Sequence, residues 1–133
     1  MGTAVGWLKA SFITGAVVDA IVGILILIPS RMGEAEFRYP MGLAASLMFG
    51  WTVLLLWGCQ KPVERKGVLL ITIFPVIAGL MASAVYQLAT GAFTLGRVLP
   101  TVILGVALIG LLGFSYFRAA TLTQEGASHP TRQ

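Results

Sequence analysis

The sequence predicts an all-α protein, an integral membrane bundle of four transmembrane helices with both termini in the cytoplasm. Hydrophobic residues make up 57% of the 133 residues and charged residues 11%, and the mean hydropathy is +0.90. This balance lies far outside the range of water-soluble domains, so lipid is the expected solvent for most of the chain. The apolar residues form four long runs, and the basic residues lie beside those runs.

The four apolar runs cover residues 10–29, 41–59, 68–89 and 98–117. Each has the roughly 20 residues that a helix rising about 1.5 Å per residue needs to cross a hydrocarbon core of about 30 Å. The runs are continuous rather than alternating in polarity, and they are too long for the strands of a membrane barrel. Residues 1–117 are therefore predicted to form one transmembrane domain of four helices.

The first run is predicted to be a retained span rather than a signal peptide. It is longer than the apolar segment of a usual signal peptide, and Asp19 lies near its centre. The segment after it reads Ser30-Arg31-Met32-Gly33, which is unlike a cleavage site with small residues.

Lysine and arginine favour the cytoplasmic side of a membrane, so their positions predict the orientation of the spans. One side holds the amino end, the segment 60–67 and the carboxyl tail, and its six basic residues are Lys9, Lys61, Arg65, Lys66, Arg118 and Arg132. The opposite side has three: Arg31, Arg38 and Arg97. This excess predicts that both termini are cytoplasmic, and we expect the protein to lie in the cell (inner) membrane.

Prolines and a change of composition mark features along the helices. Pro40 and Pro100 suit the first turns of the second and fourth helices, where no backbone donor is needed. Pro75 lies inside the third span and removes a hydrogen bond to the Ile71 carbonyl, which predicts a kink. After residue 117 the chain becomes polar, so residues 118–133 are predicted to form a disordered cytoplasmic tail.

Small residues spaced four apart predict where the helices touch, because helices associate in lipid through close packing. Two such faces are predicted to meet in an antiparallel hairpin: Gly15, Asp19 and Gly23 on the first helix, with Gly42, Ser46 and Gly50 on the second. Packing without further function is the default interpretation of such faces.

Asp19 is the candidate functional residue, because it is the only acid inside a predicted span. An aspartate at the centre of a span costs about 2.5 to 3.5 kcal/mol on insertion, and such residues usually have a function. Trp51, Thr52 and Ser83 lie near its depth and are predicted to donate hydrogen bonds to it. No cation lies at that depth, so desolvation is expected to favour the protonated carboxyl. Two interpretations stay open: a proton or cation site, and a neutral acid that bonds the bundle together.

Several kinds of site are excluded by residue types that the spans lack. The only histidine, His129, lies in the polar tail, so no catalytic triad, haem site or zinc site is expected in the membrane. Cys59 is the only cysteine, which excludes an internal disulfide. The sequence has neither a glycine-rich phosphate loop nor a basic surface interleaved with aromatics. We therefore expect no enzymatic activity, cofactor, metal or nucleic-acid partner.

The layout of four short spans with one acid midway along the first resembles that of the small multidrug resistance transporters. Those transporters have glutamate where this chain has Asp19, shorter loops, and an aromatic motif that this chain lacks, so the resemblance covers topology alone. Two functions remain. The first is a non-catalytic subunit or interaction partner that packs through its glycine-rich faces against a membrane protein or a second copy. The second is a small proton-linked transporter or channel that pairs protomers around Asp19.

Overall fold

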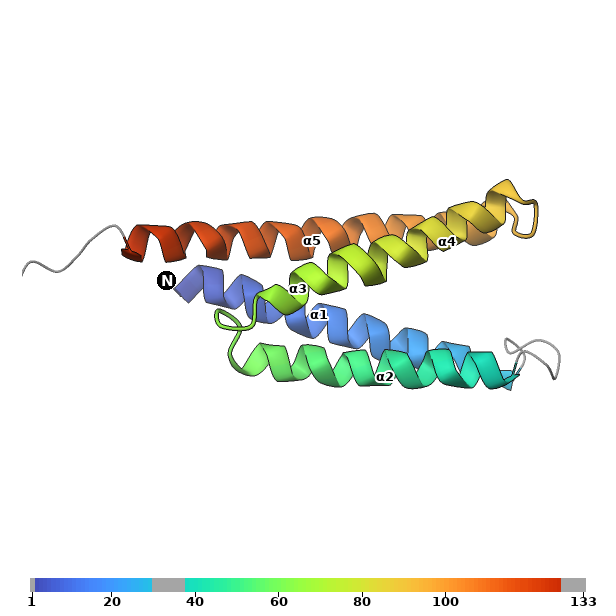
Figure 1. The fold of residues 1–133 in the computed structure, drawn as a ribbon, viewed down its shortest axis with the longest axis horizontal. Helices are drawn as coiled ribbons and strands as arrows, with labels where there is room; N and C mark the ends of the chain where they lie inside the picture. The colour runs from blue at the N-terminus through green and yellow to red at the C-terminus, as the bar shows by residue number, and fades with distance from the viewer. Residues whose placement is uncertain (1, 30–37, 128–133) are drawn as a thin grey trace, which may run out of the picture.

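The computed structural model describes residues 2–29 and 38–127, with side chains for residues 3–29 and 38–121. The elements are α1 (Gly2–Ile26), α2 (Arg38–Gln60), α3 (Gly67–Ile71), the π-helical segment η3 (Thr72–Ile77), α4 (Ala78–Ala89) and α5 (Leu95–Ala127). The third rod of the bundle consists of α3, η3 and α4, which follow one another without a break (Figure 1).

Four helices in the described part of the chain are long and apolar enough to cross a membrane: Thr3–Ile26, Arg38–Gln60, Gly67–Ala89 and Leu95–Thr121. A helix pairs its backbone groups within itself, which is what lipid requires of a spanning segment. The predicted all-α architecture with four spans is confirmed, and the chain is a small multi-pass membrane protein.

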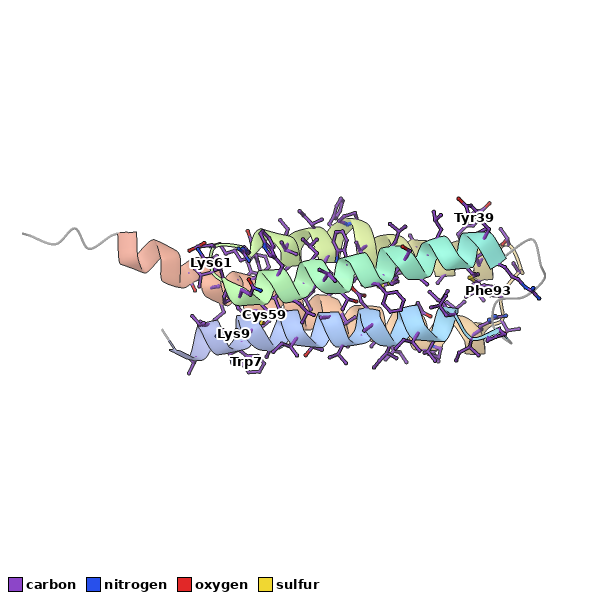
Figure 2. All side chains as sticks on the ribbon, turned by 90° about the horizontal axis from the view of Figure 1, so that it is seen from below. Trp7, Lys9, Tyr39, Cys59, Lys61 and Phe93 are labelled. Atoms are coloured by element: carbon purple, nitrogen blue, oxygen red, sulfur yellow. The ribbon has the colours of Figure 1, made fainter. Side chains whose placement is uncertain are left out.

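The two ends of the described chain, at α1 and α5, lie at one end of the bundle, which we call the terminal end. The start of α1, the end of α5 and the turn between α2 and α3 lie there, and the turn between α4 and α5 lies at the opposite end, the loop end (Figure 1). Trp7, Lys9, Cys59 and Lys61 lie toward the terminal end, and Tyr39 and Phe93 lie at the loop end (Figure 2). The relative placement of these segments is that of an antiparallel four-helix bundle.

Both terminal helices extend beyond their predicted limits. α1 begins at Gly2 rather than near residue 10, because Ala4 and Leu8 are apolar and are buried in the bundle. α5 continues to Ala127, so the predicted disorder of residues 118–127 is wrong. Ala119 is buried there, and the Thr121 hydroxyl donates to the Arg118 carbonyl at 2.9 Å. Residues 128–133 of the predicted tail lie outside the described residues.

The tightly packed core lies in the terminal half of the bundle. Its largest fully buried side chains come from α1, α2, α3 and α5: Leu8, Ser11, Phe12, Leu55, Leu69, Leu112 and Ser115. By contrast, none of the residues of α4 is buried. The α1–α2 pair and the α4–α5 pair diverge toward the loop end (Figure 1). The bundle is therefore dense at one end and open at the other.

α1 and α2 form the predicted antiparallel hairpin. A Cβ atom at Gly15 would lie 3.2 Å from Cδ1 of Leu55, and one at Gly23 would lie 3.3 Å from Cβ of Met48. Glycine at these two positions therefore lets the two backbones approach closely.

The predicted contact face on α2 is wrong. Ser46 and Gly50 are exposed, and Cβ atoms at Gly42 and Gly50 would have no neighbour within 4 Å. The ring of Phe12 instead packs against Gly58, where a Cβ would lie 3.0 Å from Cδ1 of the ring. Helical geometry places Gly42, Ser46 and Gly50 on the opposite side of α2 from Met48 and Leu55. The fit of this large ring to Gly58 thus turns the small-residue face outward.

The prolines of the third and fourth spans lie in different settings. Pro75 is inside the π-helical segment η3, which is how the predicted irregularity of the third span is accommodated. Pro100 lies inside α5 and not in its first turn, so that prediction is wrong. The helix starts earlier because the Thr94 carbonyl accepts hydrogen bonds from the N–H groups of Arg97 (3.0 Å) and Val98 (3.2 Å).

We predict that Gly58→Ala destabilises the protein by about 1 to 3 kcal/mol, because the added methyl overpacks the Phe12 ring. Gly50→Ala on the same helix is the matched control. It should not destabilise the fold of the single chain, because no described atom of the chain lies within 4 Å of its Cβ position. Unfolding by sodium dodecyl sulfate in mixed micelles measures both. Equal stability of the two variants would show that α2 faces α1 through a different side.

Candidate functional site

Asp19 lies closer to the loop end of α1 than its sequence position suggested. Because the span runs from Thr3 to Ile26, Asp19 is about 10 Å from the Ile26 end of the helix axis, at about 1.5 Å per residue. It therefore lies outside the dense core, in the half of the bundle where the two hairpins diverge.

The predicted polar cluster around Asp19 is not assembled. The Trp51 indole N–H donates to the Thr72 hydroxyl at 3.1 Å, and the Thr52 hydroxyl donates to the Met48 carbonyl at 2.9 Å. Ser83 is exposed on α4. A threonine in a helix can donate to the carbonyl one turn earlier, and in lipid that bond removes the need for another partner. The predicted donors are thus used elsewhere or face outward.

Asp19 instead lines a cavity of about 240 Å³ between the two hairpins. Its walls come from α1, α2, η3, α4 and α5, and they include Val22, Met48, Met81 and Leu104. Gly105, also in the wall, packs against Met81, so α4 and α5 stay close to each other while the cavity opens between them and α1. The cavity is therefore a consequence of two tight hairpins that separate toward the loop end.

One oxygen of the Asp19 carboxyl, Oδ2, is buried. Oδ2 has no hydrogen-bond partner among the described residues. Leaving a buried polar atom unpaired costs about 1 to 3 kcal/mol, so a hydrogen-bond donor that enters the cavity and binds this oxygen would remove that cost. Thr101, on α5, is the other residue with a polar side chain in the cavity wall as described.

No cation lies in the described wall of this cavity. Arg97 is the nearest basic residue along α5, one helical turn before Thr101. Its guanidinium lies over the ring of Phe93, 4.8 Å from the ring centroid. Arg97 is therefore held at the loop end and does not serve as the counter-charge of Asp19 in this arrangement.

A second buried polar contact was not predicted from the sequence. Ser11 on α1 and Ser115 on α5 form a hydrogen bond of 2.6 Å between their fully buried hydroxyls. Ser115 also donates to the Trp7 carbonyl at 3.4 Å. The sequence signal that could have indicated this contact is that each of the two serines lies within a long apolar run. This pair joins α1 to α5 in the dense half of the bundle.

The described residues contain no group of three or more histidine, cysteine, aspartate or glutamate side chains that could hold a metal ion. Cys59 is a half-buried free thiol. The chemical capacity of the Asp19 site is therefore that of a single carboxyl in an apolar cavity: it can bind a donor, a cation or a proton.

We predict that Asp19→Asn keeps the fold, with a change in stability within about 1 kcal/mol, because asparagine is neutral and nearly isosteric. Asp19→Lys should lower the free energy of unfolding by about 3 kcal/mol or more, because it places a cation in an apolar cavity that then has no acid to pair with it. The yield of monodisperse protein and its detergent melting temperature measure both effects. A lysine variant as stable as the parent would mean that water fills the cavity.

No family model, curated protein or solved structure matches this chain.

Proposed function

We propose that the chain is a non-catalytic membrane protein that assembles with another membrane protein or with a second copy of itself. The observation that supports this most directly is the outward ridge of α2, formed by Gly42, Ser46 and Gly50. Ser46 and Gly50 are exposed, and no atom lies near the Cβ positions of the two glycines. Small residues spaced in this way are typical of helix contacts in lipid, because they let a second backbone approach closely.

The small fraction of each span that is buried inside the bundle also favours assembly. In the most apolar stretch of each span, between 17% and 28% of the residues are buried inside the bundle. The rest of each span is left for lipid or a partner, and this outer surface includes the α2 ridge, which none of the described helices covers. A partner helix on this ridge would add close packing that lipid chains provide less well.

We predict that a cysteine at Ser46 crosslinks to a partner or a second copy in native membranes, in a Cys59→Ala background. Val106→Cys is the matched control, because Val106 is exposed on α5, away from the ridge. Oxidation followed by denaturing electrophoresis should give a crosslinked band for Ser46→Cys alone, and Gly50→Leu should remove it. No band for Ser46→Cys, or equal bands for both cysteines, would contradict assembly through α2.

We also propose that the terminal end faces the cytoplasm, in the cell (inner) membrane. The loop between α2 and α3 carries Lys61, Arg65 and Lys66, and Lys9 and Arg118 lie on the adjoining helices. The Arg65 guanidinium stacks on Trp57 at 3.5 Å from the ring centroid, which suits an aromatic belt beside a basic cytoplasmic surface.

Reporter fusions test this orientation. Fusions within residues 60–67 and after Arg118 should both show cytoplasmic activity, and a fusion at Gly91 should show the opposite. An external signal from either of the first two would reverse the proposed topology.

A proton-linked transporter or channel, working as an oligomer, is a second candidate because Asp19 faces a cavity rather than a packed core. The Asp19→Asn variant described above separates the two. Loss of a proton-driven flux in a folded variant would favour transport. A variant that changes only the folding yield would favour the structural role.

A further inference from the structure

We propose that the cavity beside Asp19 binds a small aliphatic amine that enters from the lipid and donates its N–H groups to the Asp19 carboxyl. This site lies between the two hairpins and is separate from the outward ridge of α2. Binding therefore requires neither the assembly proposed above nor transport.

The size and lining of the cavity define the apolar part of the ligand. A cavity of about 150 Å³ in a protein core is large enough for benzene, and this one has about 240 Å³. Apart from Asp19, Thr101 and Gly105, its described walls are aliphatic or thioether side chains, such as those of Val22, Ile77, Leu80 and Met81, and they include no aromatic ring. A compact aliphatic group of about the size of a cyclohexane ring matches this space.

The charges define the polar part of the ligand. Asp19 Oδ2 is buried without a described partner, and no basic side chain lines the described wall. An amine supplies both the missing donor and the missing charge. When a neutral amine meets the protonated carboxyl, the carboxyl O–H bond breaks and an N–H bond forms. The products are a carboxylate and an ammonium held together, so no other proton donor or acceptor is required.

The exposed rim of the cavity defines the route of entry. Leu80 and Leu104 line the cavity and are 48% and 43% exposed. Both belong to spans whose outer surface faces lipid, so a neutral amine dissolved in the membrane can reach Asp19 from the side. A quaternary ammonium ion lacks an N–H donor and cannot lose its charge to cross lipid. The site should therefore distinguish amines that can lose their charge from permanently charged ones.

Equilibrium binding to the full chain in lipid nanodiscs tests this site. The probes are isotopically labelled cyclohexylamine, cyclohexanol and N,N,N-trimethylcyclohexylammonium, and uptake by empty nanodiscs is subtracted. Cyclohexylamine should bind saturably at one site per chain. The affinities of the alcohol and the quaternary ion should each be lower by about tenfold or more, because a hydrogen bond between charged groups contributes on that order.

Variants locate the binding in this cavity. Asp19→Asn should weaken amine binding by about tenfold or more, because it removes the charge. Thr101→Phe should abolish binding, because Thr101 lines the cavity and a phenyl ring there takes up its volume while leaving Asp19 in place. Val106→Phe, which places the same ring on the lipid-facing side of α5, should bind like the parent.

Three results would overturn the proposal. The first is no saturable uptake above that of empty nanodiscs. The second is equal binding of the amine and either of the other two probes. The third is amine binding that Thr101→Phe leaves intact, which decides the question even if Asp19→Asn fails to fold.

Discussion

The contacts of two adjacent residues on α1 determine the arrangement of the bundle. Phe12 packs its ring against Gly58 of α2, and Ser11 hydrogen-bonds to Ser115 of α5. In lipid there is no hydrophobic driving force between helices, so close packing and buried hydrogen bonds have to hold them together. α1 makes both kinds of contact in the terminal half, and it joins α2 to α5.

The open half of the bundle follows from this concentration of contacts. Away from the dense core, α1 stays close to α2 through Gly23, and α4 stays close to α5 through Gly105. These contacts hold each hairpin together but do not hold one hairpin to the other. The cavity forms between them, and it contains the one acid of the described spans. The position of Asp19 is thus a property of how the helices are joined and not of α1 alone.

Hydropathy alone predicted the number of spans, because each span must be long and apolar to cross a bilayer. The ends of the helices were harder to predict. Apolar length does not reveal that Ala4 and Leu8 pack into the bundle, or that the backbone stays helical to Ala127. Asp19 could also be identified as unusual from the sequence, because an acidic residue within an apolar run is evident without a structure.

The surroundings of Asp19 could not be predicted, because they depend on how helices are rotated against one another. Small residues occur on both sides of α2, and spacing does not show that Phe12 selects the side with Gly58. The depth of Trp51 and Thr52 along their span predicted that they lie near Asp19. Depth cannot show that Trp51 donates to the Thr72 hydroxyl instead, or that Thr52 donates to the Met48 carbonyl. The cavity, with Thr101 in its wall, results from five elements together and has no signature in any one of them.

Disulfide trapping between α1 and α5 tests whether these helices touch at the terminal end and separate at the loop end. Ser11→Cys with Ser115→Cys, and Val22→Cys with Leu104→Cys, are pairs at matching heights on the two antiparallel helices, both in a Cys59→Ala background. A disulfide needs Cα atoms within about 7 Å. The first pair should oxidise readily, since the serine hydroxyls are 2.6 Å apart, and the second should stay reduced across the cavity. Equal oxidation of both pairs would mean that the hairpins close on each other and that the cavity beside Asp19 does not exist.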